Sequence, residues 1–132
     1  MKIKEIIWFT SVLMLGLIIT VVFFGFDDLI SNASIDLNIH DTYFVMEGLS
    51  FLLMLITLLF FWIYLIRMLV VNFKILTVNI VFLLSAILIL LFSSSSLAPL
   101  EPRGLIMIFN GLLIMLIVVT CIKTGMHMGL NK

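Results

Sequence analysis

Four long apolar runs, separated by short polar segments, constrain the fold of this chain more than any other feature. None of the runs has an Asp, Glu, Lys or Arg in its middle, and they cover about residues 6–26, 44–66, 75–92 and 105–122. Each is close to the roughly 20 residues that a helix needs to cross about 30 Å of hydrocarbon. Because backbone polar groups must be satisfied inside lipid, each run is predicted to be a transmembrane α-helix.

The composition argues against a water-soluble fold of this size. Hydrophobic residues make up 64% of the 132 residues and charged residues 11%, against about 45–50% and about 25% in soluble domains. A small soluble domain cannot bury that much apolar surface. We therefore predict one all-α integral membrane domain over residues 1–132, with four transmembrane helices and an extended outer loop between the first two.

The basic residues are distributed asymmetrically about these helices. Six of the seven lie on the side that holds the N-terminus, namely Lys2, Lys4, Arg67, Lys74, Lys123 and Lys132. Basic residues accumulate in the cytoplasmic loops of membrane proteins. Both termini are therefore expected in the cytoplasm, with the chain in a bacterial inner (plasma) membrane.

The segment between the first two predicted helices carries most of the polar chemistry. Polar and apolar residues alternate from Ser34 to His40, and this period of two predicts an extended segment on the outer membrane face. Asp41 or Thr42 suits the N-cap of the second helix, because their side-chain oxygens accept hydrogen bonds from the free N–H groups of a first turn.

This segment also resembles a known motif. Residues 32–36 (Asn-Ala-Ser-Ile-Asp) and 39–45 (Ile-His-Asp-Thr-Tyr-Phe-Val) are similar to the entry into the tenth helix of subunit I of the haem-copper (cytochrome c) oxidases. In that family the His-Asp pair binds a non-redox magnesium ion on the outer face. Two haem-ligand histidines follow eight and ten positions after the motif's histidine, where this chain has Gly48 and Ser50. The resemblance therefore implies a loop on the outer membrane face, but it does not imply a bound haem.

Two interpretations of His40 and Asp41 stay open. Magnesium usually takes one or two protein carboxylates plus waters, so these two residues are the expected ligands if the outer loop holds a metal. Alternatively, Asp41 caps the second helix and the other polar groups face water, which is the interpretation we prefer. No haem is expected, because His40 and His127 lie at opposite ends of the membrane and cannot ligate one iron.

Three polar residues near the membrane are expected to have structural roles. Glu47 lies one turn into the second predicted helix, where a carboxylate is expensive to bury and often functional. We prefer a structural pair with Arg103 on the same side. Asn110 is roughly level with Ser50 and Thr20, so a hydrogen bond between helices is expected there.

The C-terminal segment combines soft ligands that would suit copper(I), in Cys121, Met126, His127 and Met128. The chain contains nine methionines, so their proximity by chance is common. A disordered tail is therefore the interpretation that we prefer.

The function that these patterns favour is not enzymatic, because no nucleophile is visibly paired with a base and no phosphate-binding loop exists. We predict a non-catalytic accessory subunit or assembly partner of a larger membrane complex, with a respiratory complex suggested by the resemblance. The alternative is a small oligomeric transporter or channel. Ion-coupled transport usually needs an ionisable group deep in the membrane. The expected partners are the lipid bilayer and other membrane subunits or a second copy, and no nucleic acid is expected.

Overall fold

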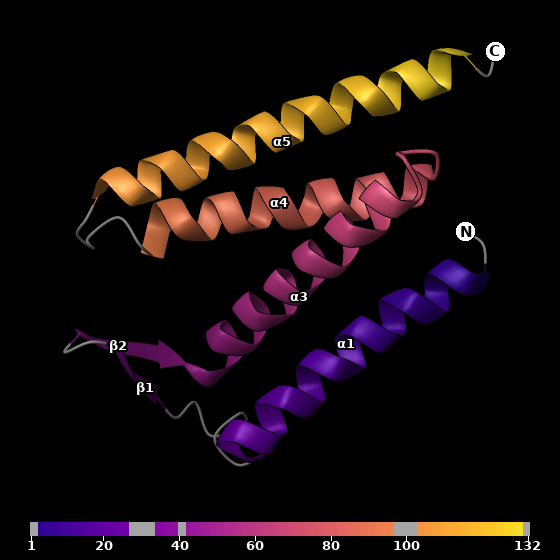
Figure 1. Cartoon of the computed structure of the whole chain (residues 1–132). Helices are drawn as coiled ribbons and strands as arrows, with labels where there is room; N and C mark the ends of the chain where they lie inside the picture. The colour runs from indigo at the N-terminus through magenta and orange to yellow at the C-terminus, as the bar shows by residue number, and fades with distance from the viewer. Residues whose placement is uncertain (1–2, 27–33, 40–41, 97–102, 131–132) are drawn as a thin grey trace. The chain divides into compact units, whose positions relative to one another are not determined.

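The structure is a computed structural model that describes residues 3–26, 34–39, 42–96 and 103–130 (Figure 1). Within these residues it has one β-hairpin and four helices long and apolar enough to cross a membrane, with mean hydropathies of 2.6 to 2.8. The helices are α1 (Ile3–Phe24), α3 (Gly48–Val70), α4 (Leu76–Ser96) and α5 (Arg103–Leu130). The four predicted helices are therefore present, and each is long and apolar enough to cross a membrane.

The ends of α1 and α5 differ from the predicted ends for local reasons. After α1, Gly25 has a positive φ of 80°, and its N–H donates to the carbonyl oxygen of Val21 at 3.0 Å. Glycine commonly ends helices in this way because it has no Cβ. The last helix continues to Leu130, past its predicted end at residue 122. Lysine is a good helix former, so Lys123 does not stop the helix.

The hairpin changes where the second membrane helix begins. Strands β1 (Ser34–Ile39) and β2 (Thr42–Glu47) are antiparallel, with Ile39 opposite Thr42. The first strand covers residues whose alternation predicts an extended segment. The second covers residues that the sequence pattern assigned to a helix from about residue 44. Its aromatic and β-branched residues favour strands, and the pairing uses their backbone groups. The helix therefore begins at Gly48, and Thr42 is a strand residue, not its N-cap.

The chain forms two units, and each is described by itself. The N-terminal unit is residues 2–59 and contains α1, the hairpin and the first half of α3. The rings of Phe24 and Phe51 meet edge-on with centroids 4.7 Å apart. Gly16 lies against the Ile56 side chain. The buried positions Val12, Gly16 and Thr20 recur every four residues, so one side of α1 packs closely on α3.

The C-terminal unit is residues 60–132 and contains the second half of α3, with α4 and α5. Five of the seven buried positions of α4 recur at alternating spacings of three and four, at Asn79, Phe82, Ala86, Ile89 and Ser93, and Val78 and Ser85 are buried beside them. The least exposed positions of α5 follow the same spacing, at Asn110, Leu113, Ile117, Thr120 and Thr124. This seven-residue repeat is typical of two helices that pack side by side with a left-handed twist.

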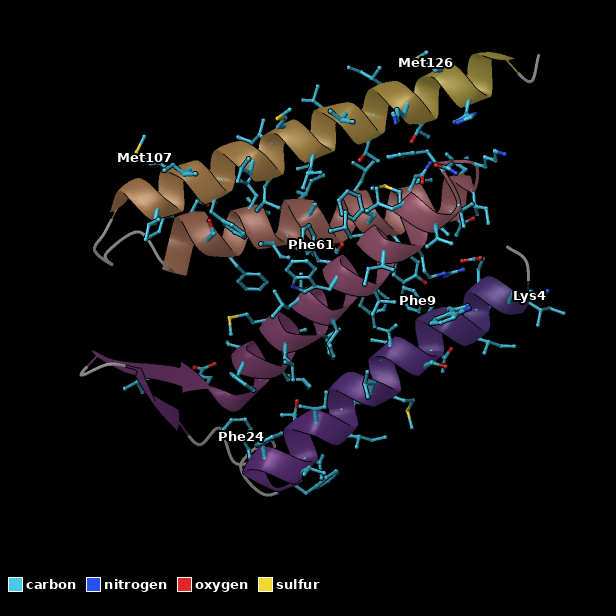
Figure 2. All side chains as sticks on the ribbon, viewed as in Figure 1. Lys4, Phe9, Phe24, Phe61, Met107 and Met126 are labelled. Carbon is cyan, nitrogen blue, oxygen red and sulfur yellow. The ribbon has the colours of Figure 1, made fainter. Side chains whose placement is uncertain are left out.

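The second half of α3 closes the core of this unit. The ring centroids of Phe61 and Phe82 lie 5.5 Å apart, and Figure 2 shows Phe61 on the side of α3 that faces α4. The hydroxyl of Thr120 lies 3.6 Å from the sulfur of Met68, which connects α5 to α3 as well. Figure 2 also shows that the Met107 side chain on α5 is directed away from α4.

Gly16 is predicted to be essential for the packing of α1 on α3. A Cβ at this position would lie 2.6 Å from Cγ1 of Ile56, and a β-branched side chain in a helix has little freedom to turn away. Gly16→Leu should lower the free energy of unfolding by about 1–3 kcal/mol, as overpacking does. Unfolding in detergent by increasing sodium dodecyl sulfate, followed by circular dichroism, measures this change.

Gly111 provides the matched control for this measurement. Nothing lies within 4 Å of a Cβ built on Gly111, and leucine favours a helix more than glycine does. Gly111→Leu should therefore leave the stability of the isolated chain equal to or slightly above that of the wild type. An equal loss in both variants would contradict the close approach of α1 and α3.

Candidate functional site

The residues predicted at the outer loop are described only in part. His40 and Asp41 lie outside the described residues, so their metal-binding role stays a prediction. The predicted capping role of Asp41 is wrong, because α3 begins only at Gly48, after strand β2. Glu47 is the last residue of β2 and is exposed, so it is not one turn inside a helix. Arg103 is the first residue of α5, and its side chain lies outside the part that the structure describes. The pair between Glu47 and Arg103 also stays a prediction.

Asn110 forms a hydrogen bond between helices, with a partner that the sequence pattern did not suggest. Its Oδ1 accepts a hydrogen bond from the hydroxyl of Ser93 on α4. Ser93 lies one residue beyond the predicted end of that helix, in a serine run that is typical of a connector. The helix continues through this run to Ser96. The hydroxyl of Thr20, one of the predicted neighbours, donates to the carbonyl oxygen of Gly16.

Asn79 forms a second hydrogen bond between the same two helices. Its Nδ2 donates to Oγ1 of Thr124 at 2.9 Å and to the carbonyl oxygen of Phe73 at 2.8 Å. The residue is completely buried, and its Oδ1 has no hydrogen-bond partner among the described residues. The amide of Asn79 therefore links α4 to both α5 and the turn that precedes α4.

These two interactions fix one antiparallel register. Ser93 follows Asn79 by 14 residues on α4, and Thr124 follows Asn110 by 14 residues on α5. At 1.5 Å per residue they are about 21 Å apart along each helix. Equal separation on the two helices shows that the pairing keeps its register between the two bonds. The polar side chains at both ends of the interface are thus used to hold the helices together.

The turn between α3 and α4 has an uncommon backbone. The N–H of Asn72 donates to the carbonyl oxygen of Leu69 at 3.2 Å, and the N–H of Phe73 donates to the carbonyl oxygen of Met68 at 3.1 Å. This pattern is the Schellman motif that closes many helices. Asn72 and Phe73 both have positive φ, at 51° and 62°. Asparagine tolerates this conformation, but for a bulky aromatic residue it is an outlier.

Phe73 is held in this conformation by its burial, by a hydrogen bond and by a cation–π contact. Its side chain is buried, and its carbonyl oxygen accepts the hydrogen bond from Asn79. The Nζ of Lys123 on α5 lies 4.7 Å from the centroid of its ring, which is cation–π geometry. The turn, the start of α4 and the end of α5 are therefore joined at one end of the C-terminal unit.

A cavity of about 330 Å³ lies at this end and is called the basic cavity below. Its lining residues are Asn72, Phe73, Lys123, Met126 and His127. Of the four soft ligands predicted at the C-terminus, only Met126 and His127 line it. Cys121 is exposed on α5, and the side chain of Met128 lies outside the described part. The sequence pattern missed Asn72 and Phe73, and an asparagine directly after a long apolar helix was the available signal.

The bond between Asn79 and Thr124 is predicted to couple the two helices energetically. In a double-mutant cycle with Asn79→Ala and Thr124→Ala, we expect a coupling free energy of about 0.6 kcal/mol and no more than about 1.7 kcal/mol, as for other hydrogen bonds in membranes. The cycle is measured by unfolding in detergent. Asn79→Ala with Ser93→Ala is the control, since these two residues make separate bonds and their effects should add. Coupling in the control and none in the test pair would contradict the described bond.

No family model matches this chain, and no curated protein or solved structure matches it. The resemblance of residues 32–45 to the oxidase segment therefore stays a prediction from the sequence.

Proposed function

We propose that this chain is a non-catalytic accessory subunit or assembly partner of a larger membrane complex. The polar side chains at the α4–α5 interface support this role, because they hydrogen-bond within the chain. Asn79 bonds to Thr124, and Ser93 bonds to Asn110. Such bonds stabilise helix packing. These side chains therefore have a structural role, which is in keeping with a subunit whose own helices pack together and which binds other subunits.

The observation that carries the proposal is an open glycine face on α5. Gly104, Gly111 and Gly125 lie at intervals that are multiples of seven, and Val118 occupies the remaining position of the repeat. The three glycines are exposed, and nothing lies within 4 Å of a Cβ built on any of them. These four residues are called the glycine face below. Small residues let two helices approach closely in a membrane, so this face suits a transmembrane helix of another subunit.

A respiratory complex is the partner that the sequence favours. The resemblance of residues 39–45 to the helix-ten entry of oxidase subunit I supports it. The segment before α3 is a short hairpin in this chain. A segment of this kind at the membrane surface offers a further contact for a neighbouring subunit.

Substitutions on the glycine face are predicted to release the partner without unfolding the chain. Gly111→Leu should lower the recovery of co-purifying subunits at least about fivefold, because overpacking at a helix contact costs about 1–3 kcal/mol. Ser94→Leu is the control, since Ser94 is exposed on α4 and the change adds similar bulk. The measurement is gentle detergent purification from native membranes, followed by quantitative mass spectrometry of the recovered subunits and a spectrum for haem.

Recovery of respiratory subunits that depends on Gly111 would support the proposal in full. Recovery of a chain that contains only copies of itself, and that conducts ions after reconstitution into liposomes, would overturn it in favour of a channel. Equal loss of partners in the Gly111 and Ser94 variants would contradict the glycine face as the contact.

Both termini are predicted to lie in the cytoplasm, because six of the seven basic residues lie on their side of the helices. A green fluorescent protein fused to either terminus should fluoresce, since it folds there. Alkaline phosphatase inserted between α4 and α5 should be active, and the same enzyme fused after Lys132 should not. The reverse pattern of phosphatase activity would show the opposite orientation.

A further inference from the structure

Positive charge collects at the end of the C-terminal unit where the basic cavity lies. Lys74 follows the turn after α3, and Lys123 lies toward the C-terminal end of α5. Residues 60–132 contain a single acid, Glu101, and it belongs to the segment between α4 and α5 in the sequence. The residues that line the cavity include no carboxylate. An anion is therefore attracted to this end of the unit.

The cavity presents hydrogen-bond donors from two directions. Lys123 and His127 are four residues apart on α5, so they lie on the same side of the helix. Asn72 lines the cavity from the turn before α4. The ring of Phe73 takes one side of the Lys123 ammonium, and an ammonium has three N–H donors. Donors on its other side can bind the oxygen atoms of an anion.

The remaining walls are apolar. Phe73 and Met126 line the same cavity as the three nitrogen-bearing side chains. A cavity with charged donors and apolar walls fits a ligand whose anionic group is attached to carbon chains. Its volume of about 330 Å³ lies at the lower end of the roughly 300–1,000 Å³ common for small-ligand sites.

The walls are tied together before any ligand binds. The amide of Asn79 donates to the carbonyl oxygen of Phe73 in the turn and to Thr124, the neighbour of Lys123 in α5. This completely buried amide therefore positions the turn wall and the α5 wall relative to each other. Binding to a prearranged cavity avoids the cost of ordering it.

We propose that the basic cavity binds a phosphate group, supplied by the headgroup of an anionic phospholipid. Lys123 contributes the charge, with His127 and Asn72 as further donors, and Phe73 and Met126 contact the first carbons of the lipid. Basic pockets between transmembrane helices are suited to such headgroups. The Lys123 ammonium disfavours a copper ion at Met126 and His127, because like charges repel in the same small cavity. None of the four residues of the glycine face lines the cavity, so either proposal can fail while the other holds.

The test uses the full chain purified in detergent, where no charged membrane surface contributes. Phosphatidylglycerol, phosphatidylcholine and inorganic phosphate are added separately, and native mass spectrometry counts the bound molecules and gives an apparent affinity for each. The variants are Lys123→Gln, Lys123→Arg and, as the matched control, Lys74→Gln. Lys74 is an exposed cation near the same turn and does not line the cavity.

We expect one phosphatidylglycerol per chain and much weaker binding of phosphatidylcholine. Lys123→Gln should weaken the binding of phosphatidylglycerol about tenfold or more, because a hydrogen bond to a charged group is lost. Lys123→Arg should keep most of the affinity. Both lysines are exposed, but Lys74 does not line the cavity, so Lys74→Gln should change the affinity by about twofold or less. The unfolding midpoint of each variant without lipid shows that its fold is intact.

Three results would overturn the proposal. Equal weakening by Lys123→Gln and Lys74→Gln would mean diffuse attraction without a site. Equal affinity for phosphatidylglycerol and phosphatidylcholine would exclude recognition of the anionic headgroup. Binding of inorganic phosphate as tight as that of the lipid, with the same dependence on Lys123, would assign the site to free phosphate.

Discussion

The paired hydrogen bonds between α4 and α5 are the interaction on which the C-terminal unit depends. Lipid tails are as apolar as leucine, so the hydrophobic effect does not bring transmembrane helices together, and packing with a few hydrogen bonds decides their register. Asn79 and Asn110 provide those bonds at the two ends of the interface. Between them, the interface positions of both helices recur with a seven-residue repeat and are mostly apolar. Once this register is set, the outer face of α5 and the position of Lys123 follow from it.

The same register brings together two groups that are each unfavourable in free energy. Phe73 has a backbone conformation that L-residues with large side chains rarely adopt, and Oδ1 of Asn79 is buried without a partner among the described residues. A glycine at position 73 would remove the backbone strain, but it would also remove the ring beneath Lys123. Strained residues persist where the surrounding structure holds them, and they are frequent at ligand sites. The strain at Phe73 is thus tied to the wall of the basic cavity.

The amino-acid sequence predicts the four membrane helices well, because the demand for satisfied backbone groups in lipid leaves an apolar run few alternatives. It predicts their ends less well. Between Thr42 and Glu47 the residues suit a strand as well as a helix, and pairing with β1 decides the outcome. The serines after residue 92 look like a connector, but their hydroxyls can bond to carbonyls of the preceding turn, as that of Ser94 does to Leu91.

The candidate site could not be read from the sequence for a related reason. Depth in the membrane suggested several partners for Asn110, and only the register of α4 and α5 selects Ser93. The basic cavity combines Asn72 and Phe73 with residues about 50 positions later in the chain. Its charged member, Lys123, was recognised only as a sign of orientation. Residues that serve as topology signals can also line a site, and composition alone does not distinguish these roles.

The shared register also has a mechanical consequence. If α5 moved along α4 by one heptad, Asn79 would face Ile117 in place of Thr124, and the bond between Ser93 and Asn110 would break in the same step. No intermediate position restores either bond, because both depend on the same offset between the helices. Sliding of α5 along α4 therefore costs both bonds together. Tilting or rotating the two helices together keeps both bonds, so these are the displacements of the helix pair that cost least.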